Sequence, residues 1–167
     1  VQKTWDGILN APVSLDDIVF AEMLWAAIKA LISVGAILVV IFLLGISRAP
    51  SLLLALPVLG FVGITFASIA LVFNALAKGY DFFTYFFTLV LTPMLLLSGV
   101  YFPVEQLPAW LAAAAEILPL KHAIDLARPL MLGRIPDAIL LHVAVLAAYA
   151  FAAYYVALAL TRRRLLK

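Results

Sequence analysis

Apolar residues are grouped along this chain in four long segments separated by short polar joins. The segments cover residues 22–44, 51–77, 82–102 and 138–161. Each reaches the length of about 20 residues that a helix needs to cross the hydrocarbon core of a bilayer. The first two joins contain Gly45, Pro50 and Gly79, which favour turns. The pattern predicts a membrane domain over residues 15–161 with four transmembrane helices.

Residues 98–133 are too apolar for an ordinary loop and too interrupted for a membrane span. Prolines at positions 103, 108, 119 and 129 divide this stretch, and proline ends or kinks a helix. The pieces are shorter than the roughly 20 residues of a span. We therefore predict two short re-entrant or interfacial helices, over residues 108–118 and 120–132, with Gly133 capping the second.

The composition excludes several classes of protein. Hydrophobic residues make up 67% of the chain and charged residues 12%, so it lacks the polar surface of a soluble domain. We predict an all-α integral membrane protein, a polytopic helical bundle. The net charge of +2 gives no nucleic-acid footprint, and the absence of cysteine excludes disulfides and thiolate metal sites. Because His-Glu-x-x-His, Gly-x-Ser-x-Gly and phosphate-loop motifs are missing, we expect no enzyme active site or bound cofactor.

The distribution of lysine and arginine predicts the orientation. The tail at 162–167 holds four basic residues directly after the last span, which places it in the cytoplasm by the positive-inside rule. An even number of spans then places Val1 in the cytoplasm as well. The 103–136 region, a helical hairpin, is predicted to face outside.

The first long helix has a clear start, and a mixed segment precedes it. Ser14 and Asp17 form a capping-box pattern, so the helix should begin near Leu15. Within residues 1–14, Trp5 is three residues from Ile8, so one or two helical turns could present an apolar face. Those residues alone favour a stub resting on lipid headgroups over a surface that docks a cytoplasmic partner.

Two features of the first two spans concern packing and charge. Lys29 lies about two turns inside the first span, where it can snorkel toward the interface or contact Trp25 through a cation–π interaction; a functional cation in a substrate path is the alternative.

The second span carries a ridge of small residues that allows helices to approach closely. Its members are Gly60, Gly63, Ala67 and Ser68.

Thr84, Thr88 and Thr92 recur every four residues in the third span and form a hydroxyl stripe along one helix face. Such a stripe is a candidate lining for a translocation path. The alternative is that the hydroxyls bond to carbonyls of the preceding turn or join two helices. Pro93 interrupts the same helix and frees the carbonyl of Leu89.

The 98–133 stretch also holds several charged residues and one histidine. Lys121, Asp125 and Arg128 lie four and three residues apart, which predicts a ladder of ion pairs on one helix. His122 has no neighbouring ligand at a metal-binding spacing, so we interpret it as a hydrogen-bonding interface residue and predict no metal site.

A set of motifs marks the outer region of the chain, namely SGVYFP from Ser98, then Leu107, Pro108 and Trp110, LPLKH from Leu118, and RPLMLG from Arg128. Further motifs lie upstream, at Thr4-Trp5-Asp6-Gly7, Ala11-Pro12, Ser14 to Asp17 and Glu22. In these motifs the chain resembles the permease subunit of type-2 ABC exporters, in particular its nodulation protein J branch.

This resemblance implies a six-span fold of which the chain holds the last four spans. It implies that the start of the chain is a coupling region against a cytoplasmic ABC ATPase, which replaces the lipid-stub interpretation. The coupling residues would be Thr4, Trp5, Asp6, Gly7 and Pro12, and the external gate would comprise Ser98, Gly99, Pro103, Pro108, Pro119, His122 and Arg128. ATP and Mg would be bound by the ATPase.

The resemblance further implies an exporter of two permease copies and two ATPase subunits in the bacterial inner membrane. Its cargo in the nodulation branch would be a lipid-linked oligosaccharide of the lipo-chitooligosaccharide type, and other members of the family would export drugs or polysaccharides. A gradient-driven secondary transporter or a non-catalytic membrane scaffold is the alternative. A secondary transporter should carry buried, coupled ionisable residues, and we interpret only Lys29 as one, so the sequence argues mildly against that alternative.

Overall fold

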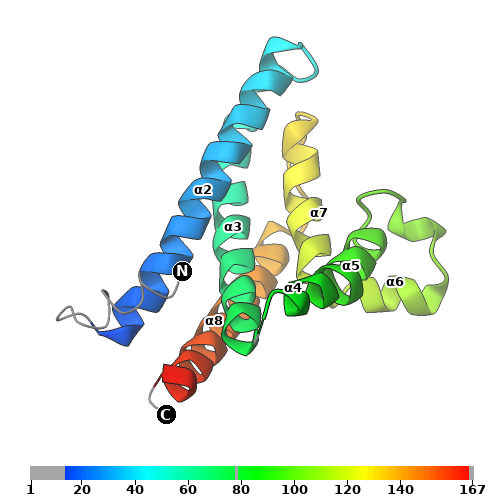
Figure 1. Ribbon diagram of the computed structural model, residues 1–167. Helices are drawn as coiled ribbons and strands as arrows, with labels where there is room; N and C mark the ends of the chain where they lie inside the picture. Colours follow the sequence, from blue (N-terminus) through cyan, green and yellow to red (C-terminus); the bar gives the residue numbers. More distant parts are fainter. Residues whose placement is uncertain (1–13, 78, 166–167) are drawn as a thin grey trace.

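The computed structural model describes residues 14–77 and 79–165, which form helices and turns. The elements are α2 (Leu15–Leu43), α3 (Ser51–Leu76), α4 (Asp81–Phe86), the π-helix η1 (Phe87–Leu91), α5 (Thr92–Leu97), the 3-10 helix η2 (Val104–Gln106), α6 (Ala109–Ala115), α7 (Pro119–Met131) and α8 (Ile139–Leu165). Figure 1 shows their arrangement. The all-helical fold class predicted from the sequence is confirmed for this part of the chain.

Three helices of the described chain are long and apolar enough to cross a membrane, namely α2, α3 and α8. Helix α3 lies between the other two and packs along both of them. Large side chains on the outer face of α2 remain exposed, among them Ile32 and Leu43, as expected of a surface that contacts lipid rather than water. These three helices correspond to the first, second and fourth predicted spans.

The third predicted span differs from the expectation of a helix over residues 82–102. A continuous helical segment runs from Asp81 to Leu97 through α4, η1 and α5, and it is shorter than the helices that qualify as spans. In Figure 1 this segment runs sideways from the lower end of α3. It stops before residue 102 because Gly99 adopts a positive φ of 83°, which turns the chain away from the helix axis. The four-span count is therefore not confirmed by helix length.

The 98–133 stretch contains two short helices, as predicted, with shifted boundaries. Helix α6 begins at Ala109 after Pro108 and ends at Ala115, so residues 116–118 form a turn rather than a last helical turn. Pro119 is the first residue of α7 rather than only the end of α6, which suits proline because that position needs no N–H donor. Gly133 has a φ of 79° directly after the helix cap and confirms the predicted C-terminal stop.

Two buried clusters join α7 to the long helices. One contains Leu38 of α2, Leu52 and Ala55 of α3, and Leu130 of α7. The other contains Ala123, Leu126 and Leu146, with partly buried residues of α3 packed around them. The small-residue ridge on α3 also packs as predicted, because a Cβ on Gly60 would lie 2.8 Å from a methyl of Leu31 in α2. Helix α7 is thus held against the bundle by side-chain packing.

Candidate functional site

The three threonines of the predicted path lie on the helical segment 81–97, and all three are exposed. The hydroxyl of Thr92 donates to the carbonyl of Phe87 at 3.0 Å, five residues back. The backbone N–H of Thr92 donates to the same carbonyl and closes the π turn η1, whose wider ring forms directly before Pro93. A proline ring clashes with the carbonyl four residues earlier, and the widened turn relieves this clash. Thr92 therefore follows the alternative interpretation, whereas for Thr84 and Thr88 the structure shows exposed residues.

The end of this helical segment is fixed to α7 by Arg128. Its guanidinium donates to the carbonyl of Gly99 at 2.5 Å. The neighbouring Ser98 is buried, and its hydroxyl donates to the carbonyl of Leu95 at 3.2 Å. Three of the predicted gate residues, Ser98, Gly99 and Arg128, are thus brought together at one junction. Arg128 makes this contact rather than extending the predicted ion-pair ladder from Asp125.

His122 lies away from that junction and contacts a residue that the sequence analysis did not select. Its Nδ1 is 2.7 Å from Nδ1 of His142 in α8, and its Nε2 is 2.9 Å from the carbonyl oxygen of Glu116. Both histidines are buried. They are the two histidines of the chain, and that count was the one signal that could have paired them, because they lie 20 residues apart on different helices.

Lys121 links the turn between α6 and α7 to the body of α7. Its ammonium lies 2.9 Å from a carboxylate oxygen of Glu116 and 2.8 Å from one of Asp125. Desolvation by burial lowers the pKa of Lys121, but the hydrogen bonds and charges of Asp125 and Glu116 together outweigh it, so the pKa is raised above the ordinary 10.5. The Lys121–Asp125 pair of the predicted ladder is confirmed.

The three predicted gate prolines have separate positions in this region. Pro103 precedes η2 and Pro108 precedes α6, each with an extended backbone, whereas Pro119 opens α7. Pro103 and Pro108 are exposed, and Pro119 is buried. Their common role in the structure is to set where the short helices begin, because a fixed φ near −65° suits a helix start.

The start of α2 lies at the opposite end of the molecule from these short helices. The predicted coupling residues Thr4, Trp5, Asp6, Gly7 and Pro12 lie outside the described residues. The predicted capping box is confirmed, since the Asp17 N–H donates to Ser14 Oγ and the Ser14 N–H donates to the Asp17 carboxylate, each at 3.2 Å. The side chain of Lys29, further along α2, lies 5.5 Å from the ring centroid of Trp25, which confirms the predicted cation–π contact.

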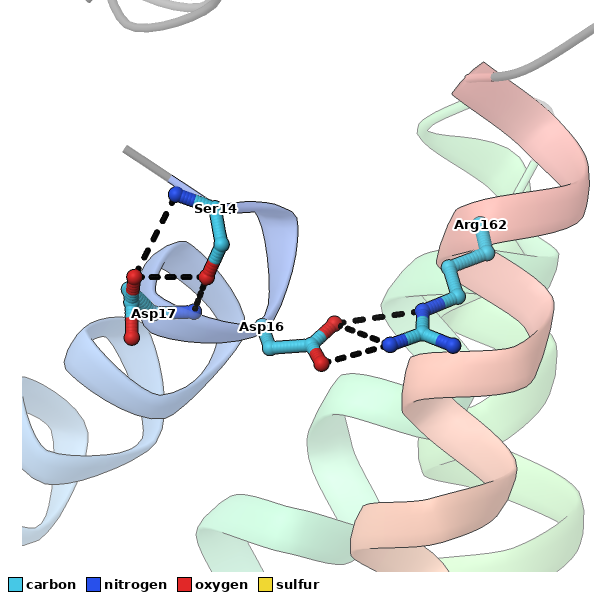
Figure 2. A network of polar contacts seen from close by, with 4 residues as sticks. All are labelled: Ser14, Asp16, Asp17 and Arg162. Carbon is cyan, nitrogen blue, oxygen red and sulfur yellow. Dashed lines mark hydrogen bonds and ion pairs between the residues drawn. The ribbon is translucent and has the colours of Figure 1, made fainter. Parts of the chain in front are cut away.

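An ion pair ties this start of α2 to the far end of α8. Arg162 donates through Nε and through one terminal nitrogen to Oδ1 of Asp16, at 3.1 and 2.7 Å. Figure 2 shows Asp16 reaching across to Arg162 while Asp17 turns back to Ser14. The two adjacent aspartates therefore have different roles: one caps its own helix and the other joins two helices. The sequence predicted only the first role.

Comparison with known proteins identifies the family of this chain. The family model described as ABC-2 type transporter matches residues 2–132. The chain belongs to the ABC-2 type transporter family. This assignment covers α2 through α7, including the helical segment 81–97 and the Gly99–Arg128 junction, and it makes the chain a membrane component of a transporter.

Several curated relatives named nodulation protein J match almost the whole chain. The protein of Rhizobium leguminosarum bv. trifolii is 47% identical over 166 residues, which is 99% of this chain and 63% of the relative. The protein of Rhizobium meliloti strain 1021 is 46% identical over 99% of this chain and 63% of its own length. That of Bradyrhizobium diazoefficiens is 44% identical over 100% and 64%. The chain thus spans a little under two thirds of these ABC-2 family relatives.

The resemblance to the nodulation protein J branch, stated first from motifs, is confirmed by these identities. No solved structure matches the chain.

Proposed function

We propose that this chain is part of the permease of an ATP-driven exporter. A separate cytoplasmic ABC ATPase subunit hydrolyses ATP with Mg, and a second permease copy completes the pathway in the bacterial inner membrane. Both ends of the chain lie in the cytoplasm, and the 103–136 region faces outside. The family match over residues 2–132 is the observation that carries this proposal.

The coupling step of this proposal uses the end of the molecule at which α2 begins. Residues 4–12 directly precede the capped start of α2, and Asp16 in the first turn is bound to Arg162 of α8. A push applied by the ATPase to the segment before Ser14 would therefore reach both α2 and α8. The two permease copies would rock apart and open a path between them.

The cargo in this proposal is an amphiphilic lipid-linked oligosaccharide, of the lipo-chitooligosaccharide type. Identity of 44–47% to proteins named nodulation protein J supports this class over drugs or polysaccharides. The helical segment 81–97 has chemistry that suits such a cargo, because exposed Thr84 and Thr88 offer hydroxyls for the sugar beside exposed Phe87 and Leu89 for an acyl chain.

A transport assay with threonine variants tests the cargo path. The full-length permease and its ATPase, in inside-out vesicles, would be assayed for ATP-dependent uptake of a labelled lipo-chitooligosaccharide. We expect Thr84→Val with Thr88→Val to reduce uptake strongly and Thr92→Val to reduce it much less, since the Thr92 hydroxyl is already bonded to Phe87. Full uptake by the triple valine variant would contradict the path.

Co-purification tests the coupling region and the energy source. We expect the ATPase to bind the parent permease, and changing Trp5 and Asp6 together to alanine to weaken binding, while Gln2→Ala with Asn10→Ala serves as the matched control. If no ATPase binds and a protonophore abolishes uptake, the gradient-driven transporter replaces this proposal. If an ATPase binds but no oligosaccharide is moved, the exporter remains and the cargo class is wrong.

A further inference from the structure

The contact between His122 and His142 connects the turn at the start of α7 to the first turn of α8. His142 is the fourth residue of α8, and His122 is the fourth of α7. The contact is buried and direct, with 2.7 Å between the two Nδ1 atoms. The same turn is held to α8 by Tyr149, whose hydroxyl donates to the carbonyl of Ile117 at 2.6 Å.

The hydrogen-bond geometry determines how many protons this pair can carry. A carbonyl oxygen can only accept, so His122 Nε2 must carry the hydrogen that it donates to Glu116. At 2.7 Å, one hydrogen fits between the two Nδ1 atoms and two do not. In the neutral pair, His142 therefore donates from Nδ1 to His122. One further proton can be added, at Nε2 of His142, without disturbing the contact.

A second added proton has no place in the closed contact. It would put a hydrogen on both Nδ1 atoms and bring two imidazolium ions together in a buried site. When the rings are separated and hydrated, each can take a proton with an ordinary pKa of about 6.5. The closed contact thus binds at most one added proton and the separated rings bind two, so acidification favours separation.

The charged groups around the pair leave this proton count unchanged. Glu116 faces it from the end of α6, and Lys121 and Asp125 face it from α7. The two carboxylates and one ammonium, paired with each other at 2.8–2.9 Å, sum to one negative charge, which suits a single added proton and does not compensate two. Helix α3, which packs against α7 and α8, contributes no charged residue. Tyr149 of α8 lies at the same turn through its hydrogen bond to Ile117.

We propose that His122 and His142 form a proton-operated latch that holds the start of α7 against α8 near neutral pH and releases it in acid. The release is local. The far end of α7 stays attached through the hydroxyl of Ser51, which donates to the carbonyl of Leu130 at 2.8 Å, and through Arg128 at the carbonyl of Gly99. Protonation therefore pivots the turn between α6 and α7 about a fixed end.

Cysteine accessibility measures the state of this latch, because the chain has no cysteine of its own. Ala123 is buried in the cluster between α7 and α8, and Leu132, just beyond α7, is exposed. Ala123→Cys would report release, and Leu132→Cys in a matched protein would correct for the pH dependence of the thiol reaction. Both would be placed in the full-length permease, freed of any other cysteine, in nanodiscs and treated with a charged methanethiosulfonate reagent.

The ratio of the two labelling rates should rise at least tenfold per pH unit once the pH is well below the ordinary histidine pKa of about 6.5, since the separated rings then hold at least one proton more than the closed contact. His142→Asn keeps an N–H at the position of Nδ1 and cannot bind a proton, so its ratio should stay low and flat. Asp125→Asn should keep an acid response, displaced in pH because the negative charge of Asp125 beside His142 is removed. His142→Ala, which offers no partner, should give a high ratio already at neutral pH.

A flat ratio in the parent would overturn the proposal. So would an unchanged acid response in His142→Asn, or its loss in Asp125→Asn, because either result assigns the proton to another group. If His142→Asn is labelled rapidly at every pH, the comparison of the parent with Asp125→Asn still tests the latch. None of these measurements depends on the ATPase or the cargo.

Discussion

Single residues fix the junction between the helical segment 81–97 and α7, and Gly99 is the most sensitive of them. Its φ of 83° is strained for any residue with a Cβ, and such an atom would lie 3.1 Å from Val104 Cγ2. We expect Gly99→Ala to lower the stability of the folded permease by about 1–2 kcal/mol. Thermal unfolding in detergent measures this. Gly79→Ala, where a Cβ meets nothing within 4 Å, is the control, and equal effects of the two changes would refute the explanation.

Lys121 provides a prediction at alkaline pH. Because its pKa is raised above 10.5 in the folded state, its ion pairs contribute stability that is complete below pH 10.5 and is lost as the pH rises through the higher folded value. As the pH rises through this range, we expect the midpoint of thermal unfolding to fall further for the parent than for Lys121→Met. At neutral pH the variant should be less stable by about 1 kcal/mol, because Glu116 is largely exposed and screened. An equal fall in the unfolding midpoints of the parent and Lys121→Met over this alkaline range would contradict this role of Lys121.

At the scale of elements, the approach of α2 to α3 depends on a glycine. Gly60 faces Leu31 so closely that a larger side chain must push the helices apart, whereas Gly35 of α2 has open space beside it. Both lie within helices, so the intrinsic cost of a β-branched residue is similar at the two sites. We expect Gly60→Val to destabilise the protein by about 1–3 kcal/mol more than Gly35→Val does. Thermal unfolding of the two variants provides the comparison, and equal midpoints would show that the contact has no effect.

Local chemistry explains which elements the sequence predicts well. The Ser14–Asp17 box, Pro119 and Gly133 act within a few residues, so the start of α2 follows from the pattern, and both ends of α7 follow to within one residue. The pairing of His122 with His142 joins two helices, and no local periodicity encodes it. Pro93 predicts a disturbance of its helix but not its form, because a kink and a widened turn both relieve the same clash.

At the scale of the whole molecule, the Asp16–Arg162 pair joins the start of α2 to the end of α8 on the far side of α3. Both side chains are about half exposed, so their contact is worth no more than about 1 kcal/mol. A double-mutant cycle of Asp16→Asn and Arg162→Gln should give a coupling energy of that size, shrinking as salt is raised. We further expect either single change to reduce ATP-driven uptake more than it reduces ATPase binding. Equal losses of both would show that the pair only supports the fold.

The π turn before Pro93 has one more consequence for the molecule. The backbone hydrogen bond from Thr92 to Phe87 spans five residues, one more than a bond of the surrounding α-helix spans. The wide turn lies between Thr84 and the Gly99–Arg128 junction, so its loss would rotate the part of the segment that holds Thr84 by about 100° relative to the anchored part, the angle of one α-helical residue. The direction in which Thr84 lies relative to the junction is therefore set by the presence of the wide turn.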